Sequence, residues 1–437
     1  MRSASWFPVL ALFGLLGLSG CGGQPDALSP SFATGTCTLT FTHIGGKTLT
    51  VQANSVNNDA GWFIKNTGAV SATITGQTVS KSGNVTAVRP INWATFPYTL
   101  AVGGQIDADL FFDAGAPGTG NVGMTISTSW GSKVLPNHPV VIQATATGIP
   151  FGVWGLSFTP LTPGPWTAGV KSSNSHSDFI NQLDAARANH IKGLWFGMAG
   201  SQSGFTTYRT STDSIFDMAK WKAKIDAGHG GTIRPDGTSG YYLDEYLSYI
   251  QDSTLLGIVI LDDITHWTDS VRFADLEEMA RFAKMRFPAL TTAVRERATE
   301  LEKRAPLCSS CTGGHSPYAK LDAGWAQYRS DRGLAATYRD QNITSATNMK
   351  LGLLLGINIT DGNRFKDPDG VTRGHNVTDA QLLSWGTEFL KTGAAYSDYV
   401  CGFFMWDVTY PTLTGATMNT LAGKAASHVR SPCKRRP

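Results

Sequence analysis

The chain has 437 residues, of which 41% are hydrophobic, 10% aromatic and 16% charged. This aromatic content excludes a disordered chain, and the length provides for two or three domains with hydrophobic cores of their own. The formal net charge of +3 is too small to indicate a nucleic-acid partner.

The N-terminal residues are typical of an exported protein. A cationic start precedes an apolar run over residues 6–16, which is too short to cross a bilayer. Residues 18–21 (LSGC) resemble the lipobox of bacterial lipoproteins. The resemblance implies a signal peptide over residues 1–21, lipidation of Cys21, a tether over residues 22–30 and a lipid-anchored protein of the cell envelope, at the outer membrane. The alternative is an ordinary signal peptide with an incidental cysteine.

The segment from residue 31 to residue 148 predicts an all-β domain. Short alternating runs of apolar and polar residues are separated by Gly, Asn and Pro, which favours a β-sandwich. The expected strands are residues 37–44, 48–56, 61–64, 70–74, 106–112, 122–127 and 140–146. Residues 96–112 and 140–148 resemble bacterial immunoglobulin-like domains of the abnormal-spindle/hydin type. That resemblance implies an immunoglobulin-like sandwich that serves as a spacer or adhesive module.

From residue 149 to residue 437, apolar strands alternate with amphipathic helices. Near-continuous apolar runs such as residues 353–358 are typical of a parallel sheet buried on both faces. We expect strands at residues 151–158, 191–198, 255–262, 290–295, 318–327, 351–358 and 399–406, with a weak one at 231–234. We expect helices at residues 178–189, 214–227, 241–251, 273–287, 334–349 and 378–391. This α/β alternation predicts a (β/α)8 TIM-type barrel, with a doubly wound open sheet as the alternative. No G-x-G-x-x-G follows the first strand, so no nucleotide cofactor is expected.

Polar and aromatic residues follow nearly every expected strand of this segment. Because the loops after barrel strands converge on one face, we expect these side chains around a single opening. Aromatic rings cover the apolar faces of sugars, and charged or amide groups bind their hydroxyls. We therefore expect a polysaccharide to be bound by Trp195, Trp267, Arg295, Trp325, Gln327, Asn358 and Trp406.

Glycoside hydrolysis requires two carboxyl groups, an acid and a nucleophile or base. We predict that Asp263 is the acid, because repulsion between it and the adjacent Asp262 raises the pKa of one of them. Asp322 is the predicted second carboxylate. The alternatives for either role are Asp262, Asp361 and Asp407. Each aspartate also has an interpretation as a helix cap or loop brace, and Trp325 and Trp406 have one as core residues.

Four motifs in this half resemble glycoside-hydrolase-like (β/α)8 domains of poorly characterised bacterial lipoproteins. They are ILDDITHW (260–267), LDAGWAQY (321–328), LGINITDG (355–362) and FFMWD (403–407). The resemblance implies a barrel with a polar mouth, without fixing a substrate. The chain departs from the family pattern at Asp263, where the pattern has Glu, and at Ile264, where it has Pro.

The mature chain has five cysteines besides Cys21. Cys308 and Cys311 most simply close a small disulfide loop in an oxidising compartment. Cys401 and Cys433 are a second candidate pair, which leaves Cys37 without an assigned partner. No metal site is predicted, because His315 alone does not complete a zinc set with the Cys308 pair. The combination of Asp262 with His266 is a weaker alternative for a metal.

Three functions compete at this point. The first is a membrane-anchored glycosidase that cleaves an extracellular or periplasmic polysaccharide without a cofactor. The second is a barrel that binds glycans without cleaving them, as an adhesion or scavenging module. The third is a purely structural role. The sequence leaves open the sugar, the linkage, the stereochemical outcome and the oligomeric state.

Overall fold

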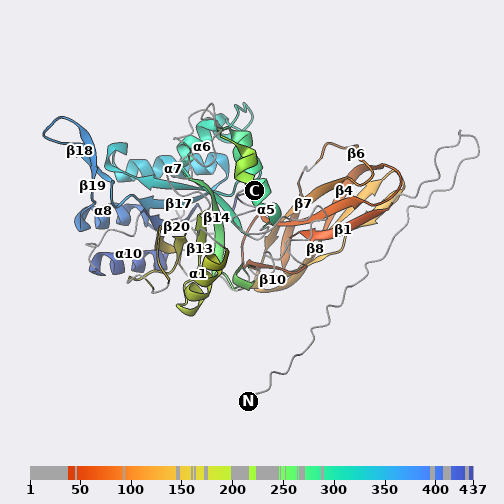
Figure 1. Cartoon of the computed structure of the whole chain (residues 1–437), viewed down its shortest axis with the longest axis horizontal. Coiled ribbons are helices and arrows are strands. Elements are labelled where there is room, and N and C mark those ends of the chain that lie inside the picture. The colour runs from red at the N-terminus through yellow and green to blue at the C-terminus, as the bar shows by residue number, and fades with distance from the viewer. Residues whose placement is uncertain are drawn as a thin grey trace, which may run out of the picture.

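The structure is a computed structural model in which an all-β part and a mixed α/β part lie side by side (Figure 1). It describes residues 38–44, 47–91, 94–143, 148–158, 161, 164–171, 176–197, 216–222, 246, 248–250, 252–262, 264, 271–286, 290–393, 399–406, 415–428 and 433–436. The predictions for the signal peptide and tether, the weak strand at 231–234, Cys21, Cys37, Asp263, Trp267 and Asp407 lie outside these residues.

The all-β part contains two sheets around one core. Its strands are β1 (Leu39–Ile44), β2 (Leu49–Gln52), β3 (Asn58–Asn66), β4 (Ala72–Gly83), β5 (Val85–Pro90), β6 (Tyr98–Leu100), β7 (Gln105–Ala114), β8 (Gly118–Thr128), β9 (Gly131–Val134) and β10 (His138–Gln143). One sheet has the order β1-β3-β7-β5, and the other has the order β2-β10-β8-β4-β6 with β9 paired to β8. Buried residues of both sheets, such as Trp62, Phe112 and Met124, share the core because alternate side chains point inward. The immunoglobulin-like resemblance stays a prediction.

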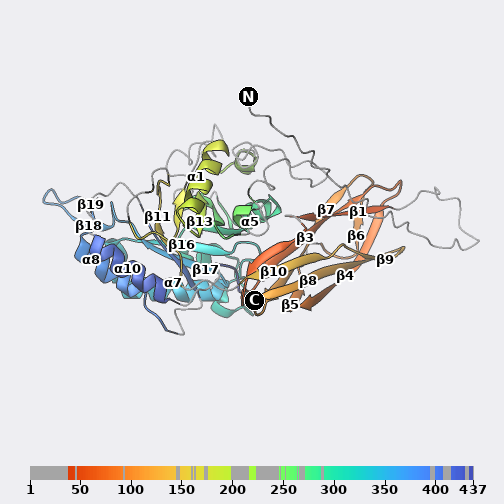
Figure 2. The same cartoon turned by 90° about the horizontal axis from the view of Figure 1, so that it is seen from below.

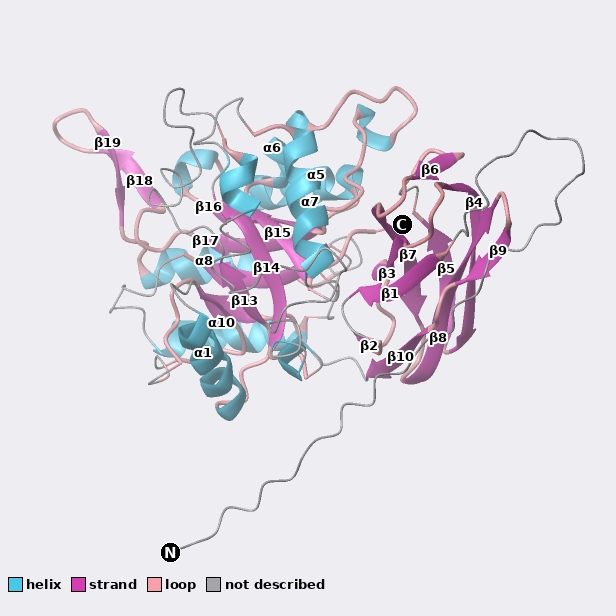
Figure 3. Ribbon diagram, turned by 45° about the vertical axis from the view of Figure 1, so that its right-hand side comes forward, coloured by secondary structure: helices cyan, strands magenta, loops and turns pink. Residues whose placement is uncertain are grey.

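The mixed part is built on one eight-stranded sheet in which every neighbouring pair is parallel. Its strands are β11 (Phe151–Val153), β12 (Gly169–Lys171), β13 (Leu194–Gly197), β14 (Leu255–Asp262), β15 (Thr291–Arg295), β16 (Ala323–Tyr328), β17 (Gly352–Ile357) and β20 (Val400–Met405). The order across the sheet is β11-β20-β17-β16-β15-β14-β13-β12. A hairpin of β18 (Asn363–Lys366) and β19 (Thr372–His375) projects from this part (Figure 3).

The prediction of a (β/α)8 barrel is wrong. The ladder of the sheet starts at β11 and ends at β12. Among the described residues, the two edge strands are joined by the isolated bridge between Trp154 and Val170 and by a few hydrogen bonds to Phe151 and Val170, without a continuous ladder. No helix lies in the described residues between β11 and β12, so the expected alternation fails at the first unit. The result is a curled parallel sheet.

Helices cover the outer face of this sheet. They are α1 (His176–Ala188), α5 (Phe273–Arg286), α6 (Ala298–Arg304), α7 (Ala335–Met349), α8 (Asp379–Phe389) and α10 (Gly415–Ser427). Apolar residues of the helices pack on outward-facing strand residues, and a second cluster that includes Trp195, Trp325 and Phe404 fills the inside of the curl. No helix in the described part of the chain is both long and apolar enough to span a membrane.

Ion pairs join the two parts, and the C-terminal segment 433–436 lies at their junction (Figure 2). Arg281 and Lys320 of the mixed part contact Asp107 and Asp109 of β7 at 3.2 and 3.0 Å. The carbonyl oxygen of Arg435 accepts a hydrogen bond from Asn57 Nδ2 at 2.5 Å. The C-terminal residues therefore contact both parts, which adds to the cohesion of the junction.

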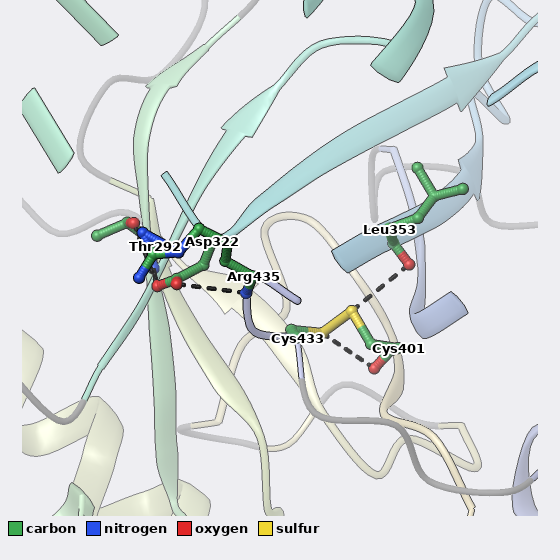
Figure 4. Close-up of a disulfide and its surroundings, with 6 residues drawn as sticks. All are labelled: Thr292, Asp322, Leu353, Cys401, Cys433 and Arg435. Atoms are coloured by element: carbon green, nitrogen blue, oxygen red, sulfur yellow. Dashed lines mark hydrogen bonds between the residues drawn. A yellow bond between two sulfur atoms is a disulfide. The ribbon is translucent and has the colours of Figure 1, made fainter. Parts of the chain in front are cut away.

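Two disulfides are present in the described residues: the predicted pair Cys308–Cys311 is confirmed, and Cys401–Cys433, which the sequence left open, is the second. Cys308 and Cys311 close a loop of the mixed part. Cys433 is bonded to Cys401, the second residue of β20 (Figure 4). This bond fixes the C-terminal segment at the amino-terminal end of that strand. A cross-link of this kind limits the freedom of the unfolded chain and holds residues 433–436 in place.

Candidate functional site

The carboxyl ends of the parallel strands bring five residues to one end of the curled sheet. Asp262 ends β14 and Arg295 ends β15, while Asn358, Trp406 and Trp154 directly follow β17, β20 and β11. These strands are buried apolar runs, so the first polar or half-buried residue appears where each strand leaves the sheet. Four of the five were predicted from the sequence, and the structure places them on the same edge.

Three tryptophans form a cluster at this end. The ring centroids of Trp154 and Trp406 are 4.8 Å apart, and Trp325 lies 5.8 Å from Trp154 and 6.3 Å from Trp406. Trp154 and Trp406 are partly accessible, whereas Trp325 is fully buried and donates its indole N–H to the carbonyl oxygen of Phe404 at 3.1 Å. Trp154 was not among the predicted residues, because the expected strand ran from residue 151 to residue 158 and placed it inside the strand, whereas β11 ends at Val153.

Arg295 links the tryptophans to a carboxylate. Its guanidinium lies 4.0 Å from the centroid of the Trp406 ring and forms an ion pair with Asp262. Burial lowers the pKa of Arg295 to about 9; the charge of Glu296 opposes this shift, and the charges of Arg332 and Arg329 add to it, so the group remains a cation at neutral pH. The guanidinium stabilises the ionised form of Asp262, and its contact with Trp406 is a cation–π interaction.

Several buried polar atoms have no hydrogen-bond partner among the described residues, and three of them belong to strands of this sheet. These three are Oδ2 of Asp262, Oε1 of Gln327 and Nε1 of Trp195. The side chain of Asp262 is 3% exposed, and Gln327 and Trp195 are 7% and 0% exposed. A buried polar atom without a partner costs free energy, so Oδ2 of Asp262 and Oε1 of Gln327 are the acceptors that this edge could offer to a ligand hydroxyl or a water molecule.

The remaining predicted binding residues contribute unequally. Gln327 donates from Nε2 to the carbonyl oxygen of Phe404 at 2.8 Å. This hydrogen bond fixes the orientation of the Gln327 amide and so the position of its Oε1. Asn358 is half-buried and accepts the backbone N–H of Asp361 at 2.9 Å, so it shapes the loop after β17. Asp361 forms an ion pair with Arg364 at 2.9 Å at the base of the β18–β19 hairpin. Trp195 and Trp325 are interior residues. A ligand at this edge would contact the partly accessible rings of Trp154 and Trp406.

Asp322 is not brought together with the other strand-end residues. It directly precedes β16, so it lies at the amino-terminal edge of the sheet, opposite Asp262 and Arg295. It is 0% exposed and accepts from Lys284 Nζ at 2.9 Å and from the backbone N–H of Thr292 at 3.0 Å. Its surroundings at the junction of the two parts give it a structural ion-pair role.

Glu296 is a further carboxyl group at the carboxyl edge, directly after β15. It is 5% exposed and accepts the backbone N–H of Arg297 at 2.8 Å. The sequence analysis did not select it, because its neighbour Arg295 was taken as the functional residue of that strand. No group of three His, Cys, Asp or Glu side chains close enough to hold a metal ion occurs in the part of the chain that the structure describes.

No protein-family model and no curated protein matches this sequence. Among solved structures, the chain is similar to the protein of a cellulase–inhibitor complex, with 9% identity, 70% of this chain and 96% of that chain covered, and a TM-score of 0.39. It is also similar to a putative alpha-galactosidase from Bacteroides fragilis, with 9% identity, coverage of 91% and 80%, and a TM-score of 0.34.

A third similar structure is a cycloisomaltooligosaccharide glucanotransferase from Paenibacillus complexed with cycloisomaltoheptaose, with 11% identity and a TM-score of 0.28. The match covers 72% of this chain and 55% of that enzyme, so the chain spans about half of the enzyme's length. At identities and TM-scores this low, the likenesses support no conclusion about activity.

Proposed function

We propose that this protein acts on a polysaccharide at the carboxyl edge of its parallel sheet, and that it hydrolyses glycosidic bonds there. The observation that supports this best is the cluster of Trp154, Trp325 and Trp406 beside the Arg295–Asp262 ion pair. The partly accessible indole rings supply surfaces for the apolar faces of a sugar ring. The charged pair and the unpartnered oxygen of Gln327 supply hydrogen-bond partners for its hydroxyls.

In this proposal, Asp262 acts in its ionised form. The Arg295 guanidinium favours the carboxylate, which suits a nucleophile, a base that activates water, or a stabiliser of the positively charged transition state. The acid that protonates the leaving oxygen is a second carboxyl group of the same edge. Glu296, buried directly after β15, and Asp263, which follows Asp262 in the sequence and lies outside the described residues, are the two candidates.

The test compares single variants that remove one charge and keep the side-chain volume. The purified protein is incubated with a panel of polysaccharides, and new reducing ends and binding are both measured. We expect Asp262→Asn to lower kcat about 10³-fold while glycan binding is retained, because a carboxylate that acts in the reaction step contributes on that order. The acid is identified by which of Glu296→Gln and Asp263→Asn causes a comparable loss.

The matched control is Asp369→Asn, which removes a carboxylate on the β18–β19 hairpin whose side chain is 51% exposed. It is expected to leave hydrolysis unchanged. Normal turnover by Asp262→Asn, Glu296→Gln and Asp263→Asn alike would remove hydrolysis at this edge from consideration. A protein that binds no polysaccharide of the panel would contradict the carbohydrate proposal as a whole.

Binding without cleavage is the second candidate function. Two observations favour it: Asp262 is already paired with Arg295, and Asp322 lies at the opposite edge of the sheet. If the unmodified protein binds a polysaccharide with an affinity that Trp406→Ala weakens, but releases no reducing ends, this second function replaces the first.

We further propose that the protein is anchored to a membrane of the cell envelope through lipidated Cys21, on the basis of the LSGC run at residues 18–21. Two or three acyl chains bind stably to a bilayer, whereas one chain does not. Cys21→Ser should therefore move the protein from the membrane fraction to the soluble fraction of the expressing bacterium and abolish incorporation of labelled palmitate. Labelling that persists in Cys21→Ser, or an unlabelled unmodified protein, would contradict the anchor.

A further inference from the structure

Guanidinium groups gather around the carboxyl ends of β15 and β16. Arg295 ends β15, Arg329 directly follows β16, and Arg332 ends the short 3-10 turn Ser330–Arg332. Burial lowers the pKa of Arg295, the charge of Glu296 raises it, and the charges of Arg332 and Arg329 lower it further, so both of these cations lie close enough to Arg295 to repel it. This concentration of positive charge requires compensation by anions.

The protein supplies that compensation for some of these cations. Arg295 is paired with Asp262, and Arg329 lies 3.3 Å from Asp331. Arg332 differs, because its Nη1 donates only to the carbonyl oxygen of Gln327 at 2.6 Å and to the hydroxyl of Tyr338 at 3.3 Å. No carboxylate of a described residue lies within ion-pair distance of Arg332, although the side chain is half-buried.

Two polar atoms at the carboxyl end of β16 are also unsatisfied. Nε of Arg329 is a buried donor without an acceptor, and Oε1 of Gln327 is a buried acceptor without a donor, among the residues that the structure describes. A ligand that satisfies both must offer an acceptor to the guanidinium and a donor to the amide oxygen. A sugar that carries an anionic substituent beside its hydroxyl groups has this combination.

We propose that the polysaccharide bound at this edge is acidic, and that Arg332, together with Arg329, binds the carboxylate of a uronic acid unit. This inference rests on the proposed carbohydrate function of the same edge. The planar fork of a guanidinium matches the two oxygens of a carboxylate. One carboxylate would therefore give Arg332 the anionic partner that it does not have among the described residues. Trp154 and Trp406 then hold the ring of the sugar, and the arginines select its charge.

The test uses polymers that differ only in this charge. Polygalacturonate, alginate and a glucuronan are each compared with their carboxyl-reduced, neutral counterparts, and a sulfated galactan is included as a second kind of anion. Dissociation constants are measured at 50 and 300 mM NaCl, values chosen to differ by roughly a factor of two in Debye length. We expect at least one uronan to bind about tenfold or more tightly than its reduced form, because hydrogen bonds to charged groups contribute on that order.

Arg332→Gln should abolish this preference and leave binding of the reduced polymer unchanged. The matched control is Arg373→Gln, which removes the same charge from an exposed hairpin residue paired with Asp369 and should retain the preference. Trp406→Ala should weaken the acidic and the neutral polymer alike, since it acts through the ring of the sugar.

The outcomes separate this inference from the function on which it rests. Equal affinity for a uronan and its reduced form overturns the acidic substrate and leaves the carbohydrate function standing. A preference that survives in Arg332→Gln overturns the role of Arg332. If Arg332→Gln weakens the binding of the sulfated galactan and not that of a uronan, the carboxylate assignment is overturned in favour of a sulfate ester. If no polymer binds, both the inference and the proposed function fail.

Discussion

Asp322→Asn should lower the free energy of unfolding by about 3–5 kcal/mol, the usual loss when one member of a buried ion pair is removed. The carboxylate of Asp322 is 0% exposed, and Nζ of Lys284 lies 2.9 Å from it. Lys284 is itself buried and retains only Asp59, at 3.0 Å, once Asp322 is neutral. An asparagine would also direct an N–H group at one of these cations or at the N–H of Thr292. Urea and thermal unfolding midpoints measure the loss.

The pH dependence of this loss follows from the charge of Asp322. Burial alone would raise its pKa, but Lys284, Lys434 and Arg435 hold the pKa below the ordinary value of 3.8. A carboxyl group with a lowered pKa contributes stability above its unfolded pKa and loses it as the pH falls through the folded value. The difference between the unmodified protein and Asp322→Asn should therefore be full at pH 7 and should close as the pH falls below about 4.

Asp369→Asn is the control for both measurements, because this carboxylate lies on the exposed hairpin and should leave the midpoint unchanged at every pH. An Asp322→Asn protein as stable as the unmodified one would show that the junction network does not hold the two parts together. A difference that is as large at pH 2.5 as at pH 7 would show that the effect arises from packing and not from charge.

The place of Asp322 could not be predicted from the sequence. The apolar run that suggested a strand over residues 318–327 begins as a strand only at Ala323, and this shift moves Asp322 from the strand to its amino-terminal end. Its partners Lys284 and Lys434 are 38 and 112 positions away in the sequence, so no local pattern reveals them. The sequence around an aspartate near a buried tryptophan is the same whether the aspartate binds a ligand or forms a structural ion pair.

The carboxyl edge was more accessible to prediction. The strands that end near Asp262, Asn358 and Trp406 are almost entirely apolar over six to eight residues, and the first polar or aromatic residue marks the end of each. The strand that ends at Arg295 has five residues and begins with two threonines. The closure of the sheet was not accessible in this way. The strand β12 has only three residues, Gly169–Lys171, and its pattern is too short to distinguish it from a loop.

Gly356→Ala should prevent formation of the site and lower stability by about 3 kcal/mol or more, at or above the upper range for overpacked cores. Gly356 lies in β17, where a β-carbon would fall far inside the contact distance of the carbonyl oxygen of Phe404 and 2.7 Å from Nε2 of Gln327. That carbonyl accepts hydrogen bonds from Trp325 and Gln327. Because the obstructing atom belongs to the backbone of β20, no side-chain rotation relieves the clash.

The displacement of the Phe404 carbonyl should also disturb the aromatic cluster, since it holds the indole of Trp325 in position. We expect a lower yield of soluble Gly356→Ala protein, a lower thermal midpoint and a changed near-ultraviolet circular dichroism spectrum. The matched control is Gly423→Ala in α10, where a β-carbon meets no atom within 4 Å. Alanine is favoured over glycine inside a helix by about 0.5–1 kcal/mol, so this variant should be slightly more stable. Native stability and an unchanged spectrum in Gly356→Ala would mean that β17 and β20 do not approach each other as closely as the arrangement of Trp325, Gln327 and Phe404 requires.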